Sequence, residues 1–461
     1  MQNKNGISLD STVKYELNAI AKSLDYTVFY DLNVTIHTPK ANLPILYPIR
    51  FDRLKDYIDH FSDVLNLTIA VPGGDYAHLI FPNKDKLEIT LEFVPLKSTT
   101  EYIRHLNGPS TKKRYIAKLT EVESDLAEGN NELQQNYQKA NQHVIKHITF
   151  QLVDKTVMAL RSKTFGTIVR NTTGMDVIKY CLTELSRNLS SGDSENIKGV
   201  NVVKGHSEEV RQHIIIPHLT KLVSVPKVVN EAVGGLYPTG FSYYLRGQYW
   251  YVYPLYDNTR FESSDMTLTI INLPANRLPG IEKTFRITAT QLIVLSTGNV
   301  KFIDTSIAEK DSVGDVIRFV DSRQVIEGYG KRDGNKFIAD YSGNITEAAI
   351  GGEVEDPNRA TIQSSTTITA AYNNEFSKLA SRNGTRALIT WENSNDAALY
   401  PGMPVRYIFT SSGELRQLYG TLHQADTVMT VVDNNVKQRK FKSITVLTCF
   451  LSNDVNNRKV K

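Results

Sequence analysis

Alternation of apolar and polar residues at a period of two is the feature that most constrains the fold of this chain. It is clearest at residues 87–93, where apolar residues at the odd positions alternate with Glu88, Thr90 and Glu92. Such a strand has one face in a core and the other toward water. Further stretches rich in β-branched and aromatic residues predict strands at 26–38, 112–122, 144–153, 267–273, 284–295, 337–341, 361–369, 387–391, 404–410, 415–423, 427–432 and 441–450.

Helical spacing of apolar residues is confined to a few short stretches. They predict one amphipathic helix at 51–61 and three more at 157–169, 176–189 and 373–382. The polar segment 123–142 has no apolar face and is predicted to project as a long excursion.

These patterns predict an α+β, β-rich fold in which two β-barrel or sandwich units flank a mixed helical middle region. The expected boundaries are 1–156 for a β-domain with one helix and 157–265 for a mixed α/β region containing an aromatic hairpin. Residues 266–461 are expected to form a β-rich region that ends in a small barrel.

Composition excludes several classes of protein. With 53 Lys plus Arg against 49 Asp plus Glu in 461 residues, the net charge of +4 indicates no specific nucleic-acid partner. Cys181 and Cys449 are the only cysteines, which excludes a disulfide framework and a cysteine-rich zinc module. The polar first ten residues predict no signal peptide, and no apolar run approaches the roughly 20 residues of a membrane span.

No pattern of reactive residues predicts an active site. His143 and His147 have a metal-binding spacing, but the glutamate that a zinc hydrolase needs after the first histidine is replaced by Val144. The chain also lacks a phosphate-binding glycine loop and a serine nucleophile elbow. We therefore expect no catalytic, cofactor-binding or metal-binding residues, and a protein that is not an enzyme. The alternative is a glycan hydrolase, which needs only two carboxylates, such as Asp257 and Glu262.

The segment 234–257 holds an unusual concentration of aromatic residues. Its sequence predicts a hairpin that turns at Arg246-Gly247-Gln248. Aromatic residues on both faces of the second strand indicate that both faces are covered. The cover could be a neighbouring subunit, the core of the same chain, or a sugar or base stacked on the rings. The candidate subunit or partner interface is Tyr237, Phe241, Tyr243, Tyr249, Trp250, Tyr251 and Tyr253.

Several patches of this sequence resemble a known family. Ile216-Pro217 leads through a helical stretch into 233–244 (VGGLYPTGFSYY), and 247–254 (GQYWYVYP) follows. Together with 399–407 (LYPGMPVRY) and 419–423 (YGTLH), these patches are similar to baseplate hub proteins of contractile-tailed bacteriophages.

The resemblance implies a structural virion protein that joins the tail tube to the central spike. It further implies a homotrimer of tail-tube-like domains whose partners are the tube, the spike and other baseplate proteins. Such a protein would be assembled in the host bacterial cytoplasm and reside in the virion. The alternatives are another tail component, either a tube or a wedge protein, or a glycan-binding or glycan-hydrolysing protein.

Overall fold

The structure is a computed structural model of the chain. It describes residues 4–22, 29–96, 112–122, 145–187, 196–273, 284–296, 300–304, 384–411, 414–433 and 440–452, together with strands at 316–321, 330–333, 336–339, 346–349 and 361–365.

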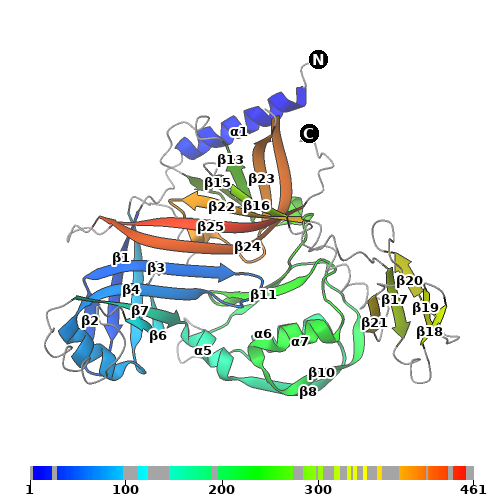
Figure 1. Ribbon diagram of the computed structural model, residues 1–461, viewed down its shortest axis with the longest axis horizontal. Coiled ribbons are helices and arrows are strands. Elements are labelled where there is room, and N and C mark those ends of the chain that lie inside the picture. The colour runs from blue at the N-terminus through cyan, green and yellow to red at the C-terminus, as the bar shows by residue number, and fades with distance from the viewer. Residues whose placement is uncertain are drawn as a thin grey trace.

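Two long antiparallel strands, β24 (Glu414–Asp433) and β25 (Lys440–Ser452), lie at the centre of the molecule (Figure 1). On its other edge, the first part of β24 pairs with β23 (Pro404–Ser411), whereas the later part pairs with β3 (Tyr47–Asp56). A β-bulge between Leu422 and Gln424 marks the change of partner. The two strands therefore belong to two β-units at once.

The first β-unit is a closed barrel. From β3 the pairing continues through five strands and returns to β25: β4 (Val64–Pro72), β7 (Ile145–Val153), β6 (Lys112–Val122), β5 (Glu88–Leu96) and β1 (Phe29–His37). A short strand, β2 (Asn42–Ile45), pairs with β1. The core contains Met429 of β24 and Phe441 of β25. The barrel is therefore completed by residues that lie nearly 300 positions after β7 in the sequence.

The second β-unit curves around a core of its own. It extends from the other edges of β24 and β25 through β23, β13 (Thr267–Asn272), β15 (Gln291–Ser296), β14 (Phe285–Ile287), β22 (Gly384–Glu392) and β16 (Val300–Asp304). Strand β13 runs parallel to both of its neighbours. Trp391, Tyr407 and Cys449 are fully buried in this core.

Buried hydroxyl groups fill the point where the two β-units meet. The Oγ1 atoms of Thr427 and Thr445, which are register partners on β24 and β25, lie 2.8 Å apart. Thr445 donates to Ser394 Oγ at 2.6 Å, and Ser394 in turn lies 2.8 Å from Ser443 Oγ. All four side chains are at most 1% exposed. Because the hydroxyls satisfy one another, the junction is polar without buried unpaired groups in this cluster.

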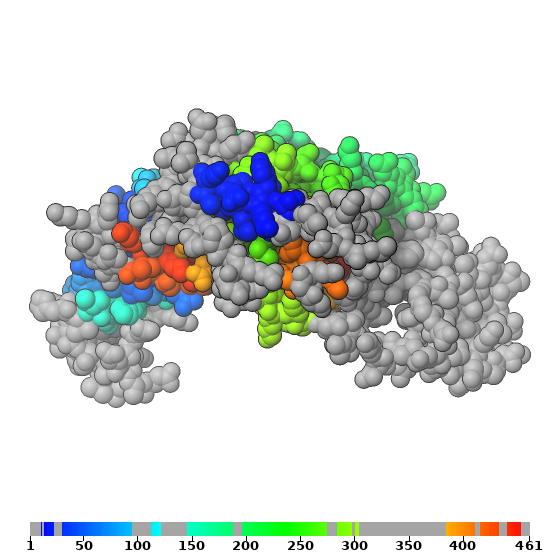
Figure 2. All heavy atoms as spheres, turned by 90° about the horizontal axis from the view of Figure 1, so that it is seen from above, coloured from blue at the N-terminus to red at the C-terminus, as the bar shows by residue number. Residues whose placement is uncertain are grey.

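Helix α1 (Lys4–Lys22) covers the outer face of the second β-unit. Val13, Leu17 and Ile20 recur at helical spacing and pack against Ile271, Ile293 and neighbouring apolar residues of β13, β15 and β23. Figure 2 shows the helix lying across this face of the molecule. No pattern in the sequence predicted this helix. Its apolar stripe is short and its mean hydropathy is low, so burial against the sheet decides its position.

The middle region packs helices against a two-stranded ribbon around a third core. The ribbon consists of β8 (Thr164–Thr173) and β10 (Val210–Lys221). The hairpin strands β11 (Phe241–Arg246) and β12 (Tyr249–Pro254) form a sheet with β9 (Gly199–Val202). The helical elements are α5 (Lys155–Ser162), α6 (Gly174–Thr183), η4 (Leu222–Ser224), α7 (Val225–Ala232) and η5 (Arg260–Ser263).

The remaining elements are short. Helical turns occur at α2 (Gly73–Asp75), η1 (Tyr76–Ile80), η2 (Phe81–Asn83) and η10 (Asp396–Ala398). Five further strands form two small sheets: β17 (Val316–Asp321), β20 (Thr346–Ala349) and β21 (Thr361–Ser365) in one, and β18 (Gly330–Asp333) and β19 (Lys336–Ala339) in the other.

The α+β, β-rich fold with two β-units and a helical middle region is confirmed, but the predicted helix at 51–61 is wrong. Residues 47–56 form strand β3, in which Phe51, Arg53, Lys55 and then Tyr57 face inward. Two charged side chains on the buried face hid the period of two. The apolar residues that remained visible happened to lie at helical spacing.

Two other predicted elements differ from the structure. The helix expected at 157–169 ends at Ser162, and the chain continues as strand β8. The strands expected at 415–423 and 427–432 form one continuous strand, β24, and the break predicted between them lies just after the bulge. The excursion at 123–142 and the helix at 373–382 lie outside the described residues.

The sharing of β24 and β25 predicts that residues 1–156 cannot fold alone. Without those strands, β1 and β3 keep unpaired edges and the first core lacks Met429 and Phe441. We expect this fragment to show no cooperative thermal transition by near-UV circular dichroism. Joining residues 414–452 to it through a Gly/Ser linker should restore the transition. Cooperative melting of the fragment without the added strands would contradict the shared-strand arrangement.

Candidate functional site

The aromatic hairpin forms as predicted, with β11 and β12 paired from Phe241↔Pro254 to Arg246↔Tyr249. The two residues between the strands make the turn. Gly247 has φ +61°, a conformation that glycine adopts at little cost, and a Cβ there would meet nothing within 4 Å. The turn therefore places Arg246 and Tyr249 together at the end of the hairpin.

Most of the predicted interface residues lie within the chain's own cores. Trp250 is fully buried, Tyr253 is 1% exposed and Tyr237 is 3% exposed, whereas Tyr249 is 42% exposed. The half-buried members are Phe241, Tyr243 and Tyr251. Contact with another subunit stays a prediction, and Tyr249 is the residue best placed to make it.

The buried tyrosines are held by hydrogen bonds to backbone carbonyls. The hydroxyl of Tyr237 donates to Val203 O at 2.6 Å, and that of Tyr253 donates to Tyr57 O at 2.7 Å. Burial raises the pKa of both hydroxyls above the usual value of 10. The Tyr253 bond joins the hairpin to the residue that follows β3, whereas the Tyr237 bond lies within the middle region.

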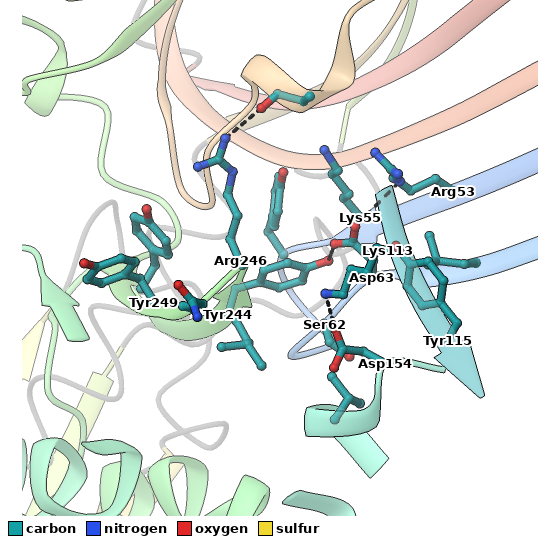
Figure 3. Close-up of a pocket in the computed structure, with 18 of the residues that line it drawn as sticks. Arg53, Lys55, Ser62, Asp63, Lys113, Tyr115, Asp154, Tyr244, Arg246 and Tyr249 are labelled. Atoms are coloured by element: carbon teal, nitrogen blue, oxygen red, sulfur yellow. Dashed lines mark hydrogen bonds and ion pairs between the residues drawn. The ribbon is translucent and has the colours of Figure 1, made fainter. Parts of the chain in front are cut away.

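A recess of about 680 Å³ lies where the hairpin meets the first barrel (Figure 3). Residues of β3, β4 and β6 form its inner wall, and the hairpin turn forms its rim. Figure 3 shows Arg246 and Tyr249 on one side and Arg53, Lys113 and Tyr115 on the other, with Asp63 and Tyr244 between them. The hydroxyl of Tyr244 donates to Asp63 Oδ1 at 2.7 Å.

A buried ion-pair cluster lies behind this wall. Arg53 Nη1 and Lys55 Nζ, both from β3, lie 3.2 and 3.3 Å from Asp396 Oδ2, and the side chain of Asp396 is only 4% exposed. Lys55 also donates to the Asp396 carbonyl oxygen at 2.5 Å. Burial alone would raise the pKa of Asp396, but Arg53 and Lys55 together lower it to about 2. The cluster joins the first barrel to the segment between β22 and β23.

His423 occupies the bulge at which β24 changes partner. Its Nε2 atom donates to Leu255 O at 2.9 Å, and its ring stacks on Phe450 with centroids 5.5 Å apart. The side chain is 1% exposed, and burial lowers its pKa to about 4. A histidine held neutral in this way is part of the core.

The described residues hold no group of three His, Cys, Asp or Glu side chains placed to bind a metal ion. His147 is described, but His143 is not. Asp257 accepts hydrogen bonds from the backbone and hydroxyl of Thr259 in an exposed turn, and Glu262 is exposed on the following helical turn. Neither residue lines the recess. In the described part of the chain no helix is long and apolar enough to span a membrane.

Arg53, Lys55 and Asp396 were not predicted from the sequence as site residues. The one available signal was their placement: Arg53 and Lys55 share a strand face with Phe51 and Tyr57. Nothing in the sequence indicates that Asp396 lies opposite them, because more than 300 residues separate it from β3.

Comparisons with known proteins found no matching family model and no matching curated protein. Among solved structures, the chain is similar to the 43 kDa tail protein of prophage MuSo2 from Shewanella oneidensis. The identity is 11%, the likeness covers 91% of this chain and 98% of that one, and the TM-score is 0.47.

Two other solved structures are also similar to this chain. A chain of the lidded Francisella PdpA–VgrG complex is 11% identical, with 96% of this chain and 57% of that one covered and a TM-score of 0.42. The c3393 protein of E. coli is a type VI secretion component described as structurally similar to the T4 bacteriophage tail proteins gp27 and gp5. It is 8% identical, with 89% and 76% covered and a TM-score of 0.39.

Replacing Asp396 by Asn is predicted to destabilise the protein by about 3–5 kcal/mol, because two buried cations lose their shared carboxylate. Urea unfolding followed by far-UV circular dichroism measures the loss. The control is Asp59→Asn, an exposed carboxylate on the turn after β3, which should change stability by less than about 0.5 kcal/mol. Equal urea midpoints for the two variants would mean that the ion-pair cluster contributes little to stability.

Acid is predicted to destabilise the junction through His423. The folded chain keeps this side chain neutral down to about pH 4, whereas the unfolded chain protonates it near 6.5. The unfolded state therefore binds more protons in this window. The free energy of unfolding should fall by about 3 kcal/mol as pH drops from 6.5 to 4. In a His423→Leu variant the free energy of unfolding should depend less steeply on pH over the same window. An unchanged pH dependence would mean that other groups cause it.

Proposed function

We propose that this chain is a structural component of a phage-type contractile tail, and specifically a baseplate hub protein that joins the tail tube to the central spike. The observation that carries the proposal is a rigid pair of joined β-units that exposes large apolar side chains on separate surfaces. The similar structures named above include a prophage tail protein and a type VI secretion component described as structurally similar to T4 tail proteins. The sequence patches at 216–254 and 399–423 support the narrower assignment to a hub.

One exposed apolar surface lies on the ribbon of the middle region. Ile168 and Ile215 are register partners on β8 and β10, and they are 57% and 60% exposed. Neither strand has a second partner within the described residues, so both outer edges can take a further strand. Adjacent exposed isoleucines on such a ribbon are typical of a protein–protein contact.

A second exposed apolar surface lies at the rim of the first barrel. Leu46, between β2 and β3, is 63% exposed, Tyr47 at the start of β3 is 48% exposed, and Ile145 at the start of β7 is 61% exposed. They line an apolar groove together with Pro44 and Pro72. We assign the ribbon to contact with a second copy of the chain and the barrel rim to the tube or spike.

In this proposal the chain acts as a homotrimer in the virion, after assembly in the host bacterial cytoplasm, and it performs no chemistry. Its symmetry separates the related roles: threefold for a hub, sixfold for a tube protein, and no closed ring for a wedge protein. A glycan-binding role would need an accessible aromatic platform. Complete burial of Trp250 disfavours that alternative.

Light scattering after size exclusion is predicted to give three times the chain mass, either for the protein alone or after its spike partner is added. An Ile168→Thr/Ile215→Thr variant should shift the population toward monomer, because it removes exposed apolar contact while keeping β-branched residues. Val432→Thr, at a single exposed valine on β24, is the matched control and should stay trimeric. A monomer at every concentration and with every candidate partner would contradict the proposal.

A further inference from the structure

The recess beside the hairpin has more positive than negative charge. Five cationic side chains line it: Arg53, Lys55, Lys113, Lys198 and Arg246. Three carboxylates compensate the inner ones. Asp396 pairs with Arg53 and Lys55, Asp154 with Lys113, and Asp63 lies 3.7 Å from Arg53. Two positive charges therefore remain, and both belong to the rim.

The two rim cations are held close to the hairpin turn. Arg246 is the last residue of β11, and its Nη2 donates to Ala397 O at 2.7 Å while its guanidinium lies 3.8 Å from the centre of the Tyr400 ring. The backbone N–H of Lys198 donates to Gln248 O at 2.8 Å, which places this residue beside the same turn. Neither side chain forms an ion pair with a carboxylate among the described residues. The contacts of Arg246 fix its orientation without neutralising its charge.

Deeper in the recess, two buried polar atoms lack a hydrogen bond among the described residues. Tyr57 is only 1% exposed, and its buried hydroxyl neither donates nor accepts a hydrogen bond among the described residues. The Nε atom of Arg53 is likewise without a hydrogen bond. Leaving a buried hydroxyl without a hydrogen bond costs free energy, so the Tyr57 hydroxyl favours a ligand that can pair with it.

We propose that this recess binds a ligand carrying a carboxylate group, with Arg246 and Lys198 holding the carboxylate at the rim and the Tyr57 hydroxyl pairing with a polar atom farther in. The planar guanidinium matches a carboxylate in geometry, and two uncompensated cations suit one or two carboxylates better than a polyphosphate. The volume falls within the roughly 300–1,000 Å³ of small-ligand sites.

Two sources can supply this chemistry: an acidic segment of another polypeptide, or a free small dicarboxylate. Apolar Leu65, Val157 and Leu245 in the wall can pack against the carbon atoms of either ligand. The inference is separate from the proposed function, because ligand binding by the chain can be measured whatever its oligomeric state.

The test uses the full chain and three probes: a short fluorescein-labelled peptide of alternating Glu and Ala, glutarate, and inorganic phosphate. Fluorescence anisotropy follows the peptide, and calorimetry follows the two small anions. We expect saturable binding of at least one carboxylate probe and weaker binding of phosphate. Peptide binding alone identifies a polypeptide segment as the source, and glutarate binding identifies a free acid.

Variants assign the binding to the recess. Arg246→Gln with Lys198→Gln should weaken it at least about tenfold, and Tyr57→Phe, which removes one oxygen atom, should weaken it about threefold. The control Lys40→Gln removes one positive charge, as Lys198→Gln does, at an exposed residue that does not line the recess, and it should leave the affinity unchanged. Because Lys198 is exposed, Lys198→Gln alone supplies the same test if the double variant unfolds.

Three results would overturn the inference. They are failure of both carboxylate probes to saturate, binding of phosphate alone, and equal weakening by Lys40→Gln and the rim variants, which would indicate charge attraction without a site.

Discussion

The whole structure depends on the pairing of β24 with β25. A buried strand must pair its backbone N–H and C=O groups on both edges, and these two strands satisfy that requirement by serving the first barrel at one end and the second β-unit at the other. Neither unit is complete without them. Gly420 lies where β24 pairs with β23 and β25, and an added Cβ there would collide with the carbonyl oxygen of Phe450, so a larger residue would disturb the second β-unit.

The junction between the units is polar where an apolar core would be expected. Four hydroxyl side chains and the Arg53–Lys55–Asp396 cluster meet there, beside the bulge that carries His423. Such groups add little to the free energy of unfolding when they are paired, but a buried charge that loses its partner strongly destabilises the fold. Their effect is to fix one arrangement of the two units, because any sliding of β3 against the 394–398 segment would leave charges buried and unpaired.

The aromatic hairpin illustrates how far composition alone can be taken. Aromatic residues on both faces of β12 correctly indicated that both faces are covered. The cover for Trp250, Tyr253 and Tyr237 comes from the chain itself, through cores that the hairpin joins to the first barrel and to the second β-unit. Sequence cannot separate cover by the same chain from cover by a second subunit, since the buried surface has the same chemistry in both. Only the exposed Tyr249 and the charged rim beside it face outward.

The sequence by itself determined the local elements: the alternation at 87–93, the extent of the strand at 112–122 and the hairpin at 241–254 all depend on neighbours a few residues apart. It failed at β3, where Arg53 and Lys55 occupy inward positions whose partner is more than 300 residues away. Only the tertiary structure decided which strands share an edge, which aromatic rings are core, and where the cationic rim lies. The physical reason is that side-chain periodicity is local, whereas edge pairing and charge compensation join distant parts of the chain, and no single segment records them.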